Sequence, residues 1–488
     1  MNKEWNDALS GINDEHIHEA ARQKYRFPRL RSIAAVLAVT ICWGALWAHL
    51  HLQEPPQAPV VSGIQSPGTL NLKNLVAAPV YPELVQYPKW DDYTDYDEYD
   101  AAYTAWRESA NAQYDQPEGY ADNLDSFFRR SIPEFLSGED NRAYSPLNVY
   151  LAMAMLAETA GGNSRQQILD LLGAESIEAL RTQAGHVWNA HYQNDGQAIS
   201  LLANSLWLDD AYSFKNKTVQ TLADSYYASV FHGDLGTAPM NEKLRAWINS
   251  QTGNLLSGYT KELELPKSTV FALASTAYFS ADWEVPFRKE DNTTELFHGK
   301  GFDRNTEFMN QTITFGTYYW GEDFGAVQLE LTGDNTMWLI LPDEGKTADE
   351  VLKSGEYWDM IQTPNAWENK KSLKINLSLP KFDISNQSDL VKGMKNLGLT
   401  DIFDHEVSDF TPMTDSNDLY VSKIDHAARV AVDEDGVIAA AYTVIMVEAG
   451  GCPAIPDTEI DFTLNRPFLF AVTSRSNLPI FAGVVEQP

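Results

Sequence analysis

The stretch that decides the fold is Asp433-Glu-Asp-Gly-Val-Ile-Ala-Ala-Ala-Tyr-Thr-Val-Ile-Met-Val447. Residues 437–447 contain no charge, no Pro and no Gly. Both of their period-two faces are small or apolar, which is typical of a strand buried on both sides. Residues 448–459 follow directly, and their glycines, prolines and acids predict an exposed loop. The pattern predicts either an ordinary central strand with a long loop after it, or a strand that enters a sheet on demand.

Two flanking motifs help to choose between these interpretations. Leu419-Tyr-Val-Ser-Lys-Ile-Asp-His426 lies upstream, and Leu464-Asn-Arg-Pro-Phe-Leu-Phe470 lies downstream. This order of elements resembles the carboxyl-terminal part of the serpins, a family of serine protease inhibitors. The resemblance implies an α+β serpin fold, with a large central and mostly antiparallel sheet and further sheets. It also implies about eight to nine helices and a mobile reactive loop near the C terminus.

Similar blocks occur in order through residues 119–488, so the resemblance covers most of the chain. Tyr144-Ser-Pro-Leu-Asn-Val-Tyr-Leu-Ala-Met-Ala-Met-Leu-Ala-Glu-Thr-Ala-Gly-Gly162 resembles the serpin helix that a Ser-Pro pair opens and glycine ends. Local patterns predict strands within residues 201–208, 272–287, 336–342 and 373–379, and helices within residues 246–253 and 390–398.

The resemblance also implies a hinge, the segment from which the inserting strand starts. Its residues are Glu434, Gly436, Val437, Ala439, Ala440, Ala441 and Thr443. Trp283 would close onto the sheet at the point where the loop enters, which is called the breach. Val437 is small enough to enter the sheet interior, and residues 436–447, the part that would insert, contain neither the Pro nor the charge that would oppose insertion.

The position of the reactive bond stays open. Counting forward from Gly436 with the family's spacing gives Gly450–Gly451. Counting back from Pro467 gives a position nearer residues 454–456, because the loop is longer than usual. The scissile bond is therefore expected within residues 447–456.

A hydrogen-bonded cluster beneath the sheet gap, the shutter, is also implied by the resemblance. Ser145 and His426 match the family directly. Asn148 stands where the family has a second Ser, and Ser275 stands where it has an Asn. Because this exchange leaves the donors and acceptors nearly unchanged, we expect a working cluster. His426 is then a structural gate and not a catalytic base.

Composition and motifs narrow the possible activities. The net charge is −32 and no basic stripe rises above it, so nucleic acid is not expected as a partner. Cys42 and Cys452 lie in such different settings that no structural disulfide is expected. Neither Gly-x-Ser-x-Gly nor His-Glu-x-x-His occurs. We therefore expect a monomeric protein that is not an enzyme and needs no metal or cofactor.

The N-terminal part predicts a membrane anchor. Residues 33–52 are apolar, lack Asp, Glu, Lys and Arg, and would cover roughly 30 Å as a helix. The preceding residues include the cations Arg22, Lys24, Arg26, Arg29 and Arg31. The positive-inside rule predicts a single-pass protein with residues 1–32 in the cytoplasm and the serpin domain outside the cell. Residues 1–21 resemble the cytoplasmic heads of single-pass bacterial proteins, which implies a bacterial membrane-anchored member of the family. A cleaved signal peptide remains the alternative.

Residues 53–118 are expected to form a tether. Pro55, Pro56, Pro59 and Pro67 predict an extended spacer. An acidic, tyrosine-rich run follows between Trp90 and Trp106, and such runs are usually solvated and disordered. The aromatic residues could instead dock on the folded domain or on a partner.

The resemblance implies an extracytoplasmic inhibitor of serine or cysteine proteases that acts as a suicide substrate. The target protease would cleave the loop, remain covalently attached and be distorted as the hinge inserts into the sheet. No Lys or Arg occurs from Ala431 to Asn465, so the loop suits elastase- or subtilisin-like enzymes and not trypsin-like ones. The alternative is a non-inhibitory surface binding module on a serpin scaffold, with the tether as its contact.

Overall fold

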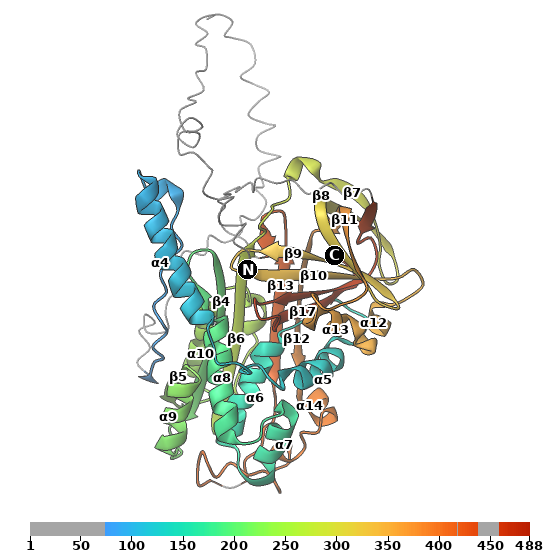
Figure 1. Cartoon of the computed structure of the whole chain (residues 1–488). Helices are drawn as coiled ribbons and strands as arrows, with labels where there is room; N and C mark the ends of the chain where they lie inside the picture. Colours follow the sequence, from blue (N-terminus) through green and yellow to red (C-terminus); the bar gives the residue numbers. More distant parts are fainter. Residues whose placement is uncertain (1–73, 417, 438–457) are drawn as a thin grey trace, which may run out of the picture. The chain divides into compact units, whose positions relative to one another are not determined.

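The computed structural model describes residues 74–416, 418–437 and 458–488 (Figure 1). These residues form two large sheets and eleven α-helices. The α-helices are α4 (Tyr96–Tyr114), α5 (Leu124–Leu136), α6 (Pro146–Thr159), α7 (Gly162–Leu172), α8 (Ile177–His191), α9 (Asn216–Ser225), α10 (Ala238–Gln251), α11 (Ser257–Thr260), α12 (Ala348–Ser354), α13 (Glu356–Gln362) and α14 (Val391–Asn396). Short 3-10 turns lie at Trp90–Asp92, Lys289–Asp291 and Asp401–Phe403.

The first sheet, sheet A, is the central one. Its strands follow the order β1-β5-β4-β6-β14-β13-β12, and β3 pairs with β4 outside this path. Only the β4–β5 pair is parallel among the described strands of this sheet. The strands are β1 (Leu75–Ala77), β3 (Gln193–Asn194), β4 (Ala198–Asp209), β5 (Ala228–Gly233), β6 (Phe271–Asp282), β12 (Phe382–Asp389), β13 (Asp425–Val432) and β14 (Gly436–Val437).

The second sheet, sheet B, packs on the sheet A strands β12 and β13 through its edge strand β2. Its order is β15-β11-β8-β9-β10-β16-β17-β2, with β7 paired to β8. The strands are β2 (Arg142–Tyr144), β7 (Thr293–His298), β8 (Asp303–Trp320), β9 (Phe324–Leu331), β10 (Asn335–Pro342), β11 (Lys370–Pro380), β15 (Glu459–Thr463), β16 (Phe468–Thr473) and β17 (Pro479–Val485). The predicted α+β fold with a large, mostly antiparallel central sheet is confirmed.

The patterned segments form the elements that the sequence predicts. The strands predicted within residues 201–208 and 272–287 are β4 and β6, and those at 336–342 and 373–379 are β10 and β11. The predicted helices are α10 and α14. The helix total exceeds the eight or nine expected, since α4 lies before the predicted domain and α11 has only four residues.

Helix α6 shows why the fold has one dominant core. It begins after Ser145, with Pro146 in its first turn, where a missing N–H costs nothing. Nearly all of its residues are buried, because it contacts both β6 of sheet A and β17 of sheet B. A helix that is apolar on all sides is stable only in such a position. It therefore fixes the two sheets relative to each other at the shutter.

The acidic, tyrosine-rich run is not disordered, so that expectation is wrong for its described part. Residues 96–114 form α4, whose N-cap Asp95 accepts a hydrogen bond from the Asp97 backbone N–H. Asp97 and Glu98 lie in its first turn, where the helix dipole favours negative charge. Strand β1 precedes it and pairs with β5 (Figure 1). The segment therefore docks on the folded body, which was the alternative interpretation.

The predicted location of the protein needs correction. Among the described residues, no helix has both the length and the apolarity that a membrane crossing requires. Helix α4 has 19 residues, but acids and other polar side chains recur along it. The finding contradicts a single-pass membrane protein with a cytoplasmic N terminus, and that prediction is withdrawn. The segments on which it rested, residues 1–32 and 33–52, lie outside the described residues.

Candidate functional site

The hinge enters sheet A between β6 and β13. Strand β14 consists of Gly436 and Val437, which pair with Asp282 and Ala281 of β6. On its other side, Val437 pairs with Val432 of β13. Among the described residues no pair joins β6 directly to β13. The line that continues from Val437 between these two strands is therefore the path that an inserted strand would follow.

Gly436 is required by a close backbone contact. A Cβ atom on this residue would lie 2.3 Å from the Ala281 carbonyl oxygen and 2.7 Å from the Asp282 Cα atom. Both contacts involve backbone, which cannot move aside as a flexible side chain can. Only glycine therefore lets the chain approach β6 closely enough for Val437 to enter the ladder, where this valine is 2% exposed.

Trp283 lies at the predicted breach. Its indole Nε1–H donates to the Asp433 carbonyl oxygen at 2.9 Å, and its backbone N–H donates to the Asp435 carbonyl at 3.0 Å. The backbone N–H of Phe287 donates to the Glu434 carbonyl at 3.1 Å. Trp283 is buried, and its ring packs edge-on against Phe287. The turn before the hinge is thus fixed through its backbone carbonyls.

The Glu434 side chain is held by a network that sequence analysis missed. Its carboxylate lies 2.6 Å from Lys381 Nζ and accepts a hydrogen bond from Asn292 Nδ2 at 2.5 Å. Lys381 also pairs with Glu307 at 3.2 Å. Burial pulls the pKa of Glu434 upward, but these hydrogen bonds carry it below its usual value. Nothing local in the sequence shows which acid Lys381 would meet, because Glu434 lies 53 residues further along the chain.

Like charges crowd the same turn. Burial, together with the nearby carboxylates of Asp435 and Asp433, raises the pKa of Asp282 to about 6. Burial also raises the pKa of Asp433. The hinge is therefore held by one buried ion pair and several backbone bonds against the repulsion of its own acids.

The shutter residues form two separate pairs. On one side, the Ser145 backbone N–H donates to His426 Nε2 at 3.2 Å, and the Ser145 hydroxyl donates to the Ile480 carbonyl at 2.7 Å. The Tyr144 ring packs edge-on against His426. This pair links the start of α6 to β13 and β17.

On the other side, Asn148 Nδ2 donates to Ser275 Oγ at 2.9 Å, and the Ser275 hydroxyl donates to Asn204 Oδ1 at 2.8 Å. Asn204 in turn donates to the Tyr226 carbonyl at 2.8 Å. The exchanged residues Asn148 and Ser275 thus bind each other. Sequence analysis missed Asn204. Its only signal in the sequence is that it is a single Asn within a largely apolar strand. Among the described residues no hydrogen bond connects this trio to Ser145 or His426.

His426 is buried and neutral. Burial lowers its pKa to about 4, so at pH 7 its Nε2 accepts the Ser145 N–H bond. Assigning Nε2 as the acceptor places the ring proton on Nδ1. This arrangement fits a structural gate, and the role of His426 stays a prediction.

Some predicted site residues cannot be placed. Ala439, Ala440, Ala441, Thr443, Gly450 and Gly451 lie outside the described residues. Within the described ranges, no group of three or more His, Cys, Asp or Glu side chains could hold a metal ion.

Comparisons with known proteins agree with this geometry. The family model described as Serpin (serine protease inhibitor) matches residues 127–488, and the chain therefore belongs to the serpin family. Serpin B4 from Homo sapiens is 28% identical over 385 residues, covering 72% of this chain and 95% of that protein. Leukocyte elastase inhibitor from Homo sapiens is 28% identical over 355 residues, covering 70% and 92%.

The fold is also similar to solved serpin structures. The native state of the thermophilic serpin tengpin has a TM-score of 0.68 at 26% identity, covering 77% of this chain and 95% of that chain. The latent state of tengpin has a TM-score of 0.63 at 25% identity, covering 76% and 98%.

Proposed function

We propose that this protein inhibits serine or cysteine proteases by cleavage of its reactive loop followed by strand insertion. The observation that carries the proposal is the position of β14. Val437 is already paired on both sides, and the strands that flank it are not paired with each other among the described residues. Residues 438–447 can continue this strand between β6 and β13. Family membership supports the same mechanism.

In the proposed reaction, the protease nucleophile attacks a carbonyl carbon in the loop, within residues 447–456. The peptide C–N bond breaks, the new amine leaves with a proton from the catalytic histidine of the protease, and an acyl-enzyme remains. The freed hinge then inserts into sheet A and carries the protease with it. The oxyanion hole is distorted before water can hydrolyse the ester, so the complex persists.

Insertion is strongly favourable in this scheme. About ten residues would gain ladder hydrogen bonds at ~1 kcal/mol each, which amounts to roughly 10 kcal/mol before apolar burial is counted. A form with the loop outside the sheet must then be held by a kinetic barrier. The close contact at Gly436 and the ion pair of Glu434 lie where that barrier would be set.

The loop composition supports elastase- or subtilisin-like targets. Around Gly450–Gly451 the residues are small and include no cation that a trypsin-like pocket requires. A relative that is 28% identical carries the name leukocyte elastase inhibitor. A bacterial origin, a monomeric state and the lack of a nucleic-acid partner stay predictions from the sequence.

The test is incubation with elastase-, subtilisin- and trypsin-like enzymes, followed by denaturing gels and mass spectrometry of the released peptide. We expect a covalent band with the first two and a cut within residues 447–456. Ala439→Arg, which places a charge on the inward face of the inserting strand, should turn the protein into a substrate. Ala439→Val is the matched control, because it changes the same position without adding a charge. Clean cleavage with every enzyme would favour a binding module instead.

A further inference from the structure

The segment before the serpin-like region is attached to the outer part of sheet A. Strand β1 pairs with β5 in the registers Leu75↔Phe231 and Ala77↔Val230. The Tyr81 ring then packs against Trp188 of α8 and against Tyr192, with ring centroids 5.1 and 5.4 Å apart. These contacts extend the sheet and cover α8 with a segment that the family model does not include.

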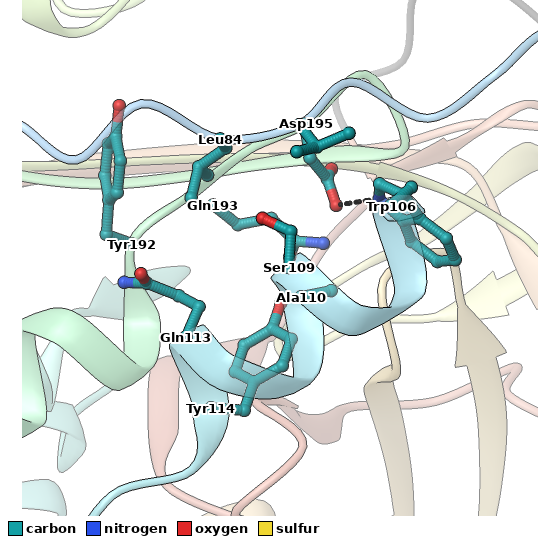
Figure 2. A pocket seen from close by; sticks show the side chains of 10 residues that line it. Leu84, Trp106, Ser109, Ala110, Gln113, Tyr114, Tyr192, Gln193 and Asp195 are labelled. Atoms are coloured by element: carbon teal, nitrogen blue, oxygen red, sulfur yellow. Dashed lines mark hydrogen bonds between the residues drawn. The ribbon is translucent and has the colours of Figure 1, made fainter. Parts of the chain in front are cut away.

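Helix α4 makes the most specific of these attachments. Trp106 Nε1–H donates to Asp195 Oδ2 at 3.0 Å (Figure 2), and the Tyr87 backbone N–H donates to the Asp195 carbonyl. Tyr87 and Trp106 also pack edge to face, with centroids 4.9 Å apart. A hydrogen bond to a buried carboxylate is stronger than one between neutral groups. Asp195 is therefore the main anchor of α4 on the turn between β3 and β4.

This anchor lies on a short path to the hinge. Asp195 Oδ1 accepts hydrogen bonds from the backbone N–H groups of Gln197, at 3.1 Å, and Ala198, at 3.4 Å. Ala198 is the first residue of β4 and pairs with Ala281 of β6. Ala281 pairs with Val437. Trp106 is thus connected to Val437 of the hinge by the Asp195 side chain and by two strand pairs, Ala198 with Ala281 and Ala281 with Val437.

The same helix also contacts sheet B. Arg475, in the turn between β16 and β17, lies over the Tyr114 ring at 5.3 Å and pairs with Asp334 at 3.3 Å. Beyond the helix, the Tyr120 hydroxyl donates to Ser476 Oγ at 2.7 Å. Residues 74–120 therefore bridge two bodies: the strands β3–β6 with α8, and the turns of sheet B.

Strand insertion would move these two bodies relative to each other. A complete new strand widens a sheet by about 4.8 Å between its neighbours. Strands β12 and β13 are packed on sheet B through β2, so the outer part from β6 to β1 would shift against sheet B. The β9–β10 turn of sheet B is also hydrogen-bonded to this outer part, through Thr332 to Asp282 and Gln197 and through Asn335 to Gln193, so these contacts would be strained together with those of α4. Contacts of α4 with both bodies would then be strained on at least one side.

We propose that residues 74–120 form an intramolecular clamp that stabilises the hinge in its short β14 state and slows further insertion of the loop. Trp106 bonded to Asp195 is its contact on the sheet A side, and Tyr114 and Tyr120 are its contacts on the sheet B side. The clamp rests on the proposed insertion mechanism for its consequence, but its coupling to the hinge can be measured separately.

The first experiment measures amide hydrogen exchange at Ala198, Ala281 and Val437 in the full chain. Trp106→Ala should speed exchange at these amides about tenfold, because the turn anchor is lost. Trp90→Ala is the matched control: Trp90 is 44% exposed, and its ring packs only on Tyr96 and Tyr99 of the same segment among the described aromatics. If Trp106→Ala does not fold, Trp106→Tyr, which lacks the indole donor, and Tyr120→Phe serve instead.

The second experiment follows spontaneous loop insertion without protease, as the gain of resistance to heat and the loss of loop cleavage. Trp106→Ala should convert several-fold faster than the wild type, and Trp90→Ala should not. Unchanged hinge exchange in Trp106→Ala, or equal acceleration by both variants, overturns the clamp. Faster hinge exchange with no inserted form in any variant supports the clamp contact and overturns the insertion mechanism, so the two failures are distinguishable.

Discussion

The hinge and the shutter hold the strands β6 and β13 of sheet A in different ways. At the hinge, β6 and β13 are joined by β14 and by the bonds of Trp283 to the turn between β13 and β14, and the Glu434 side chain of that turn is held by Lys381, which lies between β11 and β12. At the shutter, Asn148 and Ser275 bind toward β4, whereas Ser145 and His426 bind toward β13. The hinge is cross-linked across the gap, and the shutter is divided by it.

This difference indicates which bonds must break when β6 and β13 move apart. At the shutter, no hydrogen bond joins the two halves directly, but both are anchored on α6, so wider separation of β6 and β13 must break the bonds of one half to that helix. At the hinge, wider separation must break the β14 ladder bonds and the bonds of Trp283 and Phe287, and release of the turn must also leave the Glu434 carboxylate without Lys381, which costs several kcal/mol. We therefore expect substitutions at the hinge to have larger effects than those at the shutter.

Lys381→Met is the strongest test of the comparison. It leaves the Glu434 carboxylate buried without its cation, so the free energy of unfolding should fall by about 4 kcal/mol. Urea unfolding followed by tryptophan fluorescence measures this change. Lys289→Met is the matched control, because Lys289 and Asp435 are both exposed and 3.8 Å apart, and such pairs contribute little. Equal losses in both variants would contradict the special role of the buried pair.

The shutter half with His426 should respond to acid. Its folded pKa of about 4 lies below the ordinary value of 6.5, so the unfolded state binds a proton first. Its contribution to stability is complete above about pH 6.5 and falls as the pH drops toward 4, by up to about 3 kcal/mol.

His426→Asn should therefore flatten the acid limb of the stability profile, and urea midpoints from pH 7.5 to 4.5 measure it. His191, whose pKa burial also lowers to about 4, makes the matched variant, since it lies in α8 away from the gap. If both variants flatten the profile but only His426→Asn alters the rate of loop insertion, the gate role is supported. An unchanged profile in His426→Asn would contradict the burial of a neutral ring.

The other half of the shutter, formed by Asn148 and Ser275, allows the exchange of Ser and Asn between these two positions to be tested by its effect on the free energy of unfolding. Asn148→Ala removes the donor to Ser275 and should cost about 2 kcal/mol. The double variant Asn148→Ser with Ser275→Asn restores the arrangement expected from the family and should recover most of that loss. A double-mutant cycle from urea unfolding gives the coupling energy. No recovery would mean that Asn204 and α6 accept only the present arrangement.

The smallest effect is expected at Asp282. Asn at this position removes one of the three crowded acids, so stability at pH 7.5 should rise by under about 1 kcal/mol. The folded pKa of Asp282 is raised to about 6, so its penalty grows as the pH rises toward that value and is complete above it. At pH 5 the unfolded-state carboxyl is still ionised, so about half of the gain of Asp282→Asn should remain, and it should disappear near pH 4. A gain that is unchanged near pH 4 would point to packing and not to charge.

The sequence by itself determined the class of fold and the main elements. Its alternating and apolar segments became β4, β6, β10 and β11, because burial on one or both faces is written into local side-chain periodicity. The Ser145-Pro146 start of α6 and the glycine at position 436 were also readable. The Ser145-Pro146 start is set by backbone geometry within a few residues, whereas the close approach to Ala281 and Asp282 that requires Gly436 is visible only in the structure.

Only the tertiary structure decided which distant groups meet. Residues 96–114 have the composition of a solvated segment, and they fold as α4 because Asp195 and Arg475 provide partners far along the chain. Lys381 finds Glu434 far along the chain, and the shutter divides into two halves because β6 and β13 flank β14. Such pairings depend on three-dimensional packing, which local periodicity and propensity do not encode.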